Sequence, residues 1–324
     1  MRRNERSKTD SPDVTNLAII IRYVPSKFLG DKTTTEMFRD GMKAENYGPT
    51  RWHECVSAVI NSCLEDKECT KDNLLETAAS MPFLVDVGGA LSDINKCKIE
   101  KQCGQSIISD GNDLFISAFL EKNEMEGYFT HGIETNSGIW EDGLAEGADE
   151  HIERKFTEKL KIIGQSAKYG GHSCKSCPPN LCKSQALRDI LTKMDQTNII
   201  RPKIVYIGDG SNDACPGLHV LSENDILLAR YGKKRKDPNS LSGLTSDEDS
   251  IEEHAQRTLH PEMHGDEFES HVGGAFSIWS TLHRAKVDDG LEPKCQVYAW
   301  RSGRQLRSII SQILDGTLST SNRR

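Results

Sequence analysis

Short, unbroken apolar stretches alternate with polar turns along much of the chain. The stretch 204–207 contains only β-forming residues, and the polar turn 208–213 follows it directly. Such a run predicts a strand that is buried on both faces, as in a parallel sheet. Comparable patterns predict strands at 17–24, 105–109, 226–229 and 296–300.

Apolar residues at helical spacing fill the segments between these strands. The segment 31–100 is mostly of this kind, with Trp52, Val56 and Ile60 on one helical face. Further helices are predicted after residue 109, after Lys183 and over 306–314. The alternation predicts an α/β core formed by 17–30, 101–232 and 292–316, with 31–100 as a separate helical module.

Two segments are too polar to contribute to a core. Residues 1–16 form a charged tail, and residues 233–291 contain the acidic run 247–253. Segments of low hydrophobicity and high charge cannot bury enough apolar surface to fold, so we expect disorder in both. The basic run 233–236 has two interpretations, a localisation signal or the edge of a solvated loop.

Composition and charge narrow the class of protein. The chain has 324 residues, a net charge of −8 and ten cysteines. An acidic balance argues against binding of nucleic acid, which needs a basic surface. The apolar run 17–21 is too short for a signal peptide or a membrane helix. We therefore expect a cytoplasmic protein with reduced thiols and no membrane partner, and the sequence leaves its oligomeric state open.

The turn 208–213, Gly-Asp-Gly-Ser-Asn-Asp, contains the main candidate chemistry. Asp209 and Asp213 are four residues apart and face the same side if the turn continues into a helix. Two carboxylates at one point suit Mg²⁺. A dinucleotide fingerprint would need glycine at Asp213, and an EF-hand would need glycine at Ala214 and glutamate at Val220. An ordinary turn after a strand is the remaining alternative.

The segment 105–113 offers a second candidate site. A short predicted strand ends in Ser109-Asp110-Gly111-Asn112-Asp113, and a helical pattern follows. A serine beside a helix N-terminus can hold a phosphate oxygen through its hydroxyl and nearby N–H groups. The alternative is a plain N-cap loop, in which Asn112 or Asp113 caps the helix.

Three further signals each have two interpretations. The segment 31–36 has Thr33 and Glu36 at capping-box spacing, and it also looks like the phosphorylation motif of ion-pumping ATPases; we favour the cap. In the next helix, Trp52 and His53 could contact a substrate, although core and surface positions are the simpler expectation. Within 172–183, cysteines 174 and 177 have zinc-knuckle spacing, and residues 172 and 182 are candidates to complete the ligand set.

Two of these motifs resemble one enzyme superfamily. The turn 208–213 resembles the fourth motif, G-D-G-x-N-D, of haloacid-dehalogenase-like phosphatases. The segment 172–183, H-x-C-x-x-C-P-x-N-x-C-K, resembles the phosphoethanolamine/phosphocholine branch, which also includes pyridoxal-phosphate and plant thiamine-phosphate phosphatases. The resemblance implies a three-layer, Rossmann-like, mostly parallel sheet with a small helical cap at 31–100.

The resemblance also implies a function and a set of site residues. The implied activity is Mg²⁺-dependent hydrolysis of a small phosphorylated metabolite, a phosphomonoester, through an aspartyl-phosphate. Asp209 and Asp213 would hold Mg²⁺, and Lys183 would offset the phosphate charge. In the segment that resembles the second motif, the phosphate-binding residues would be Ser109, Asp110 and Asn112.

The first motif of that superfamily, D-x-D-x-T, does not occur in the sequence. Its first aspartate is the nucleophile, and its second acts as general acid and base. Asp10 and Asp13 have the wrong spacing, and no strand is predicted before them. Two hypotheses follow: a phosphatase whose given start omits the nucleophile, or a non-catalytic relative that binds metal or a phosphate ester. We expect no turnover by the superfamily mechanism from these 324 residues alone.

Overall fold

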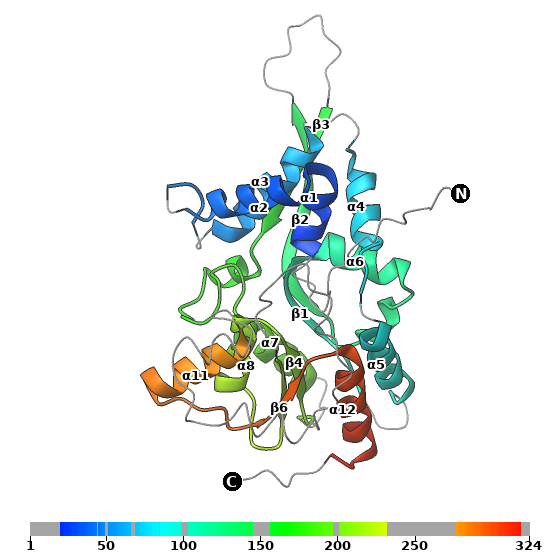
Figure 1. Cartoon of the computed structure of the whole chain (residues 1–324), viewed down its shortest axis with the longest axis vertical. Coiled ribbons are helices and arrows are strands. Elements are labelled where there is room, and N and C mark those ends of the chain that lie inside the picture. Colours follow the sequence, from blue (N-terminus) through cyan, green and yellow to red (C-terminus); the bar gives the residue numbers. More distant parts are fainter. Residues whose placement is uncertain are drawn as a thin grey trace, which may run out of the picture.

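The computed structural model describes residues 20–43, 45–48, 51–65, 69–83, 85–98, 103–144, 156–196, 201–231 and 277–318. The described residues form two three-stranded sheets surrounded by helices (Figure 1). Three of the four strand pairings are parallel. The predicted α/β class with a mostly parallel sheet is therefore confirmed.

The second sheet contains β4 (Val205–Gly208), β5 (Ile226–Arg230) and β6 (Gln296–Trp300), all parallel. Successive β5 side chains pack on opposite faces, because strand side chains alternate. Ile226 and Leu228 pack against one group of helices, and Leu227 and Ala229 pack against another. These four side chains are almost completely buried. The strand thus lies in the middle layer of three, as its apolar sequence predicts.

Helices cover both faces of this sheet. One face packs on α7 (Lys183–Gln196), α8 (Ala214–His219) and α11 (Ile278–Asp289). The other face packs on α5 (Val85–Lys96) and α12 (Gly303–Asp315), which lie side by side at the lower right of Figure 1. Helix α5 therefore packs with the core sheet, although its sequence lies in the predicted cap segment 31–100.

The first sheet has the order β1-β2-β3. Strand β1 (Ile107–Asn112) is parallel to β2 (Ile133–Leu144), which forms an antiparallel hairpin with β3 (Phe156–Ile163). Strand β3 is absent from the strands that the sequence predicts. In this strand Leu160 and Ile162 are buried, whereas Glu158 is exposed, so the strand alternates between core and solvent.

A helical module covers the first sheet at the top of Figure 1. It consists of α1 (Ile20–Leu29), α2 (Asp31–Gly41), α3 (Trp52–Leu64) and α4 (Lys71–Ala79). These helices share one apolar cluster with β1, β3 and α6 (Asp113–Lys122). Three short 3₁₀ segments complete the described elements: η3 (Glu126–Tyr128), η4 (Gln165–Tyr169) and η5 (Ser211–Asp213).

Three expectations about local structure are wrong. The predicted strand at 17–24 is helical from Ile20, because the buried side chain of Val24 packs in the apolar cluster of the module. Helix α2 begins at Asp31 after Gly30, which adopts a φ of 78°, so Thr33 does not cap it. Helix α11 lies within the segment 233–291 that was predicted to be largely disordered, because Ile278 and Trp279 anchor it in the core.

Two other expectations fall on residues that the structure does not describe. The charged tail 1–16 lies outside the described residues, and so does the acidic run 247–253. The division of the chain into a core and a cap remains a prediction.

Candidate active site

Asp213 is the most heavily hydrogen-bonded carboxylate at the end of β4. Its Oδ1 accepts from Lys183 Nζ at 2.6 Å and from the Tyr206 hydroxyl at 2.9 Å. Its Oδ2 accepts from the backbone N–H groups of Asp209 at 3.0 Å and Gly210 at 2.9 Å. Burial by itself raises the pKa of Asp213, but the Lys183 charge and these donors outweigh it and lower the pKa.

The glycines of the turn allow this close arrangement. A Cβ added at Gly208 would lie 2.4 Å from Asp213 Cβ, so any larger residue would push the carboxylate away from β4. The chain then passes through η5 into α8, which places Asp213 directly under the strand end. The Gly-Asp-Gly sequence therefore has a packing reason as well as a chemical one.

Lys183 is the first residue of α7 and is buried, with only 8% of its surface exposed. Burial alone would lower the pKa of its ammonium group, but Asp213 and Asp110 outweigh that effect and raise the pKa. Asp209 contributes in the same direction. One buried cation thus interacts with three carboxylates, which leaves the site with an excess of negative charge.

Asp110 lies at the end of β1, where the pairing register with β2 shifts between Ser109 and Asn112. Such a bulge redirects side chains at the end of a strand. Its Oδ2 accepts a hydrogen bond from the Asn212 side chain, which joins the end of β1 to the turn after β4. Its Oδ1 is buried without a hydrogen-bond partner. Burial raises the pKa of this carboxyl group.

Ser109 and Asn112 flank Asp110 and differ in their contacts. The Ser109 hydroxyl is buried and accepts from the Gly111 N–H at 3.1 Å. Asn112 Oδ1 caps α6 by accepting from the Phe115 N–H at 3.0 Å, while its Nδ2 is buried without a partner. The sequence is compatible with either a plain cap or a phosphate site here. The Asn112 cap is present, and its unsatisfied amide leaves a donor for a ligand.

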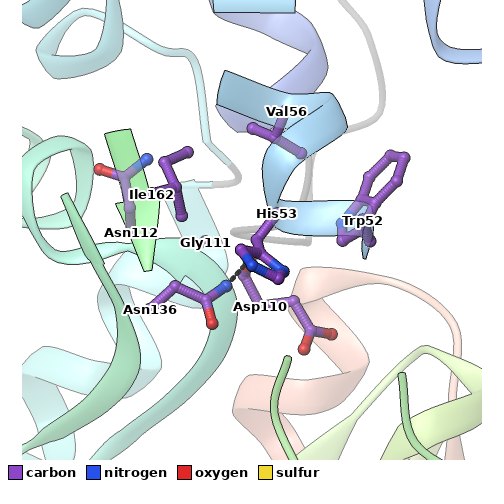
Figure 2. Close-up of a pocket in the computed structure, with 8 residues that line it drawn as sticks. All are labelled: Trp52, His53, Val56, Asp110, Gly111, Asn112, Asn136 and Ile162. Carbon is purple, nitrogen blue, oxygen red and sulfur yellow. Dashed lines mark hydrogen bonds between the residues drawn. The ribbon is translucent and has the colours of Figure 1, made fainter. Parts of the chain in front are cut away.

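A small pocket connects this strand end to the helical module (Figure 2). Trp52, His53 and Val56 of α3 line one side, and Asp110 lines the other. Burial lowers the pKa of His53, and its Nδ1 is buried without a hydrogen bond. His53 therefore faces the site, although the sequence analysis favoured a surface position for it. The pocket is further lined by Gly111, Asn112, Asn136 and Ile162.

Asn136 is a buried positioning residue that was not among the predicted site residues. Its Nδ2 donates to the Asp110 carbonyl oxygen at 2.8 Å, the dashed line in Figure 2. Its Oδ1 accepts from the Gln165 N–H at 3.0 Å and from Asn180 Nδ2 at 3.2 Å. One buried amide thus joins β1, β2, η4 and the loop before Lys183. No local pattern marks such a residue, because its partners are distant in sequence.

The donor set fits a hard divalent cation. The partnerless Asp110 Oδ1 is an unsatisfied carboxyl oxygen in a site where three carboxyl groups interact with the charge of Lys183. Asp209 is mostly buried and lies 3.9 Å from Arg230, measured from Oδ2 to Nη1. Both carboxylate oxygens of Asp213 already accept hydrogen bonds from protein groups. The structure therefore brings together Lys183 and the three aspartates, with Ser109 and Asn112 on the adjoining strand end.

The chain is similar to phosphatases over much of its length. Residues 26–240 match the model of a family described as Putative Phosphatase. The Pyridoxal phosphate phosphatase PHOSPHO2 of Mus musculus is 31% identical over 188 residues, which are 58% of this chain and 68% of that protein. The human protein of the same name is 29% identical over the same shares of both chains.

A plant relative is named for a different activity. The Inorganic pyrophosphatase 2 of Arabidopsis thaliana is 33% identical over 214 residues, which are 62% of this chain and 68% of that protein. Among the described residues, no helix is both long and apolar enough to span a membrane.

Proposed function

Because the chain belongs to the Putative Phosphatase family, a branch of the haloacid-dehalogenase-like phosphatases, we propose that this site serves Mg²⁺-dependent hydrolysis of a small phosphomonoester. The observation that supports this most directly is the partnerless Asp110 Oδ1 among three carboxylates around Lys183. Pyridoxal phosphate is the first candidate substrate, since the PHOSPHO2 relatives are named as pyridoxal phosphate phosphatases. Phosphocholine and phosphoethanolamine are the next candidates.

Asp110 and Asp209 would hold the metal ion in this proposal. Asp213 was predicted as the second ligand from its spacing to Asp209, but its oxygens accept four hydrogen bonds from the protein. We therefore assign Asp213 to holding Lys183 and keep direct metal binding by Asp213 as the alternative. Bound Mg²⁺ would neutralise phosphate charge and stabilise the charge that develops during phosphoryl transfer.

The other residues would bind and orient the phosphate ester. Lys183 supplies a fixed positive charge at a helix N-terminus, held in place by Asp213. The Ser109 hydroxyl and the unpaired Asn112 Nδ2 are donors suited to phosphate oxygens. Trp52 and His53 of α3 lie where the organic part of the ester would enter, so the helical module would determine substrate choice.

A nucleophilic carboxylate is required for the aspartyl-phosphate route, and D-x-D-x-T does not occur in these 324 residues. Strands β1 and β4 are the end strands of their sheets as described, and Asp110 and Asn212 join their carboxyl ends. Ile207 of β4 is 37% exposed, whereas every apolar residue from 226 to 229 in the adjacent β5 is buried.

The second candidate function is binding without turnover, which the missing motif favours. The 5′ end of the transcript distinguishes the two. An in-frame upstream segment with an apolar strand and D-x-D-x-T would identify the extended protein as the phosphatase. A transcript that begins at Met1 would favour a protein that binds metal or phosphate ester. None of the ten cysteines forms a disulfide, which supports a cytoplasmic protein, and the net charge of −8 argues against a nucleic-acid partner.

The biochemical test measures Mg²⁺ binding by calorimetry and phosphate release from pyridoxal phosphate, phosphocholine, phosphoethanolamine and pyrophosphate. We expect the 324-residue chain to bind Mg²⁺ without efficient turnover, and Asp209→Asn to weaken binding at least about tenfold, or about 1.4 kcal/mol. Asp40→Asn is the matched control, because this exposed aspartate of α2 is paired only with Lys43 at the surface. Efficient release by the 324-residue chain would contradict the requirement for D-x-D-x-T, and equal Mg²⁺ binding by both variants would contradict the metal site.

A further inference from the structure

Four cysteine sulfur atoms meet beside this site, and we propose that they bind a structural zinc ion. The Sγ atoms of Cys174, Cys177, Cys182 and Cys215 all lie within 4.8 Å of one another. Three of these side chains are buried, and Cys174 is partly buried. Four converging thiols are the usual ligand set of a closed structural zinc site.

The distances suit a metal centre better than a disulfide. The sulfur atoms of Cys174 and Cys215 are 3.4 Å apart, and all four cysteines are free. In a tetrahedral site with zinc–sulfur bonds of about 2.3 Å, the sulfur atoms lie about 3.8 Å apart. A disulfide bond measures about 2.05 Å. The cluster therefore needs only small side-chain shifts to enclose a zinc ion.

Polar groups of the neighbouring backbone and side chains surround the cluster. The backbone N–H groups of Ser176 and Cys177 are directed at the Cys174 sulfur, and that of Lys183 at the Cys177 sulfur. The Ser184 hydroxyl lies 2.9 Å from Cys215 Sγ. Polar contacts of this kind orient the ligands of a metal site.

His172, a ligand candidate from the sequence, is used in another way. Its Nδ1 accepts from the Cys174 N–H at 3.2 Å, so its proton lies on Nε2, which donates to the Pro178 carbonyl oxygen at 2.9 Å. Both ring nitrogens therefore hold the loop together. The fourth ligand is Cys215 of α8, which is far along the sequence from the other three cysteines.

The position of the cluster gives the zinc a structural role. Cys182 directly precedes Lys183, and Cys215 follows Asp213 by two residues. A zinc ion would therefore hold together the two segments that supply the buried Lys183–Asp213 ion pair. This proposal does not depend on phosphatase activity, since a tetrathiolate zinc site leaves no position for substrate.

The first experiment measures metal content and spectra of the whole protein. We expect about one zinc ion per chain by elemental analysis, and release of that zinc when a thiol reagent modifies the cysteines. Replacement by Co²⁺ is expected to give strong sulfur-to-cobalt charge-transfer bands and the intense visible bands of a tetrahedral site. These spectra need no mutation, so they test the site even if cysteine variants fail to fold.

Two variants then locate the zinc. Cys215→Ser is expected to weaken zinc binding at least about tenfold in competition with a chromophoric chelator. Cys295→Ser is the matched control, because Cys295 is also buried in the core around β4–β6 but lies outside the cluster. Zinc-free protein with four titratable thiols, a disulfide within the cluster, or equal zinc binding by both variants would overturn the proposal.

Discussion

The ends of β1 and β4 each present a buried carboxylate, and the two carboxylates have opposite surroundings. Asp213 after β4 accepts four hydrogen bonds from the protein, and its pKa is lowered. Asp110 near the end of β1 accepts one hydrogen bond from a side chain, has a partnerless oxygen, and its pKa is raised by burial. A satisfied buried charge stabilises the fold, whereas an unsatisfied one costs stability and is available to a ligand.

The comparison separates structural from functional carboxylates at one site. Asp213 completes a buried ion pair, so its replacement should lower the free energy of unfolding. Replacement of Asp110 should weaken metal binding instead. Glu134 of β2 extends the comparison to a carboxylate that is not among the proposed ligands, because it is buried and accepts hydrogen bonds from several partners.

The largest effect is expected for Asp213→Asn. An amide has one acceptor oxygen, so it cannot accept from Lys183, Tyr206 and two backbone N–H groups together. Breaking a buried ion pair typically costs about 3–5 kcal/mol, and we expect a loss of this size in the free energy of unfolding, measured with urea. Tyr206→Phe removes one donor and should cost only about 1.5–3 kcal/mol. Equal losses for the two variants would show that Asp213 contributes no more to stability than the Tyr206 hydroxyl.

The second effect is a pH dependence that arises from Glu134. Burial raises its pKa, but Lys193, Lys168 and Gln165 outweigh this and lower the pKa from 4.5 to about 2. The folded state therefore binds fewer protons, so the stabilisation is present above pH 4.5 and is lost as pH falls toward 2. We expect Glu134 to contribute roughly 3 kcal/mol to the loss of stability over that range.

Glu134→Gln tests this contribution by urea unfolding at several pH values. The variant should be less stable near neutral pH and should lose less stability on acidification. Glu141→Gln is the control, because Glu141 lies on the same strand but its side chain is 51% exposed and paired with Lys161. An exposed pair contributes little, so the control should follow the pH profile of the native protein. A parallel profile for Glu134→Gln would show that its pKa is not lowered.

The smallest change in stability is expected for Asp110→Asn. Removing a buried charge with a partnerless oxygen should leave the free energy of unfolding within about 1 kcal/mol or increase it. Mg²⁺ binding should weaken at least about tenfold, measured by calorimetry. A large loss of stability with unchanged Mg²⁺ binding would show that Asp110 has a structural role and is not a metal ligand.

Asp113→Asn is the control for Asp110→Asn. The Asp113 carboxylate accepts from the Gly138 N–H at 2.7 Å and from the Ser137 hydroxyl at 3.1 Å. Its replacement should reduce stability by about 1 kcal/mol without a change in Mg²⁺ binding. The two neighbouring aspartates are thus expected to affect different measurements.

The parts of the site that were predictable from sequence are the short-range ones. The strand and turn around Asp209 follow from an apolar run that ends in glycines and acids, and β4 and η5 confirm that local structure. Residues 278–285 also contain a helical pattern, but the acidic run before them led to a prediction of disorder. The charge of the preceding residues did not predict the structure of 278–289, because helix α11 is held by the buried side chains of Ile278 and Trp279.

The sequence by itself determined the phosphatase family, the α/β class and the segments that supply Lys183, Asp209 and Asp110, because each depends on residues close together in the chain. Only the tertiary structure decided that Asp213 is fully hydrogen-bonded and that Asp110 has an oxygen without a hydrogen-bond partner. It also brought Cys215 to the cysteines before Lys183 and His53 to the end of β1. The physical reason is that hydrogen bonding, burial and metal coordination depend on distances between atoms, and folding sets those distances across segments that share no local pattern.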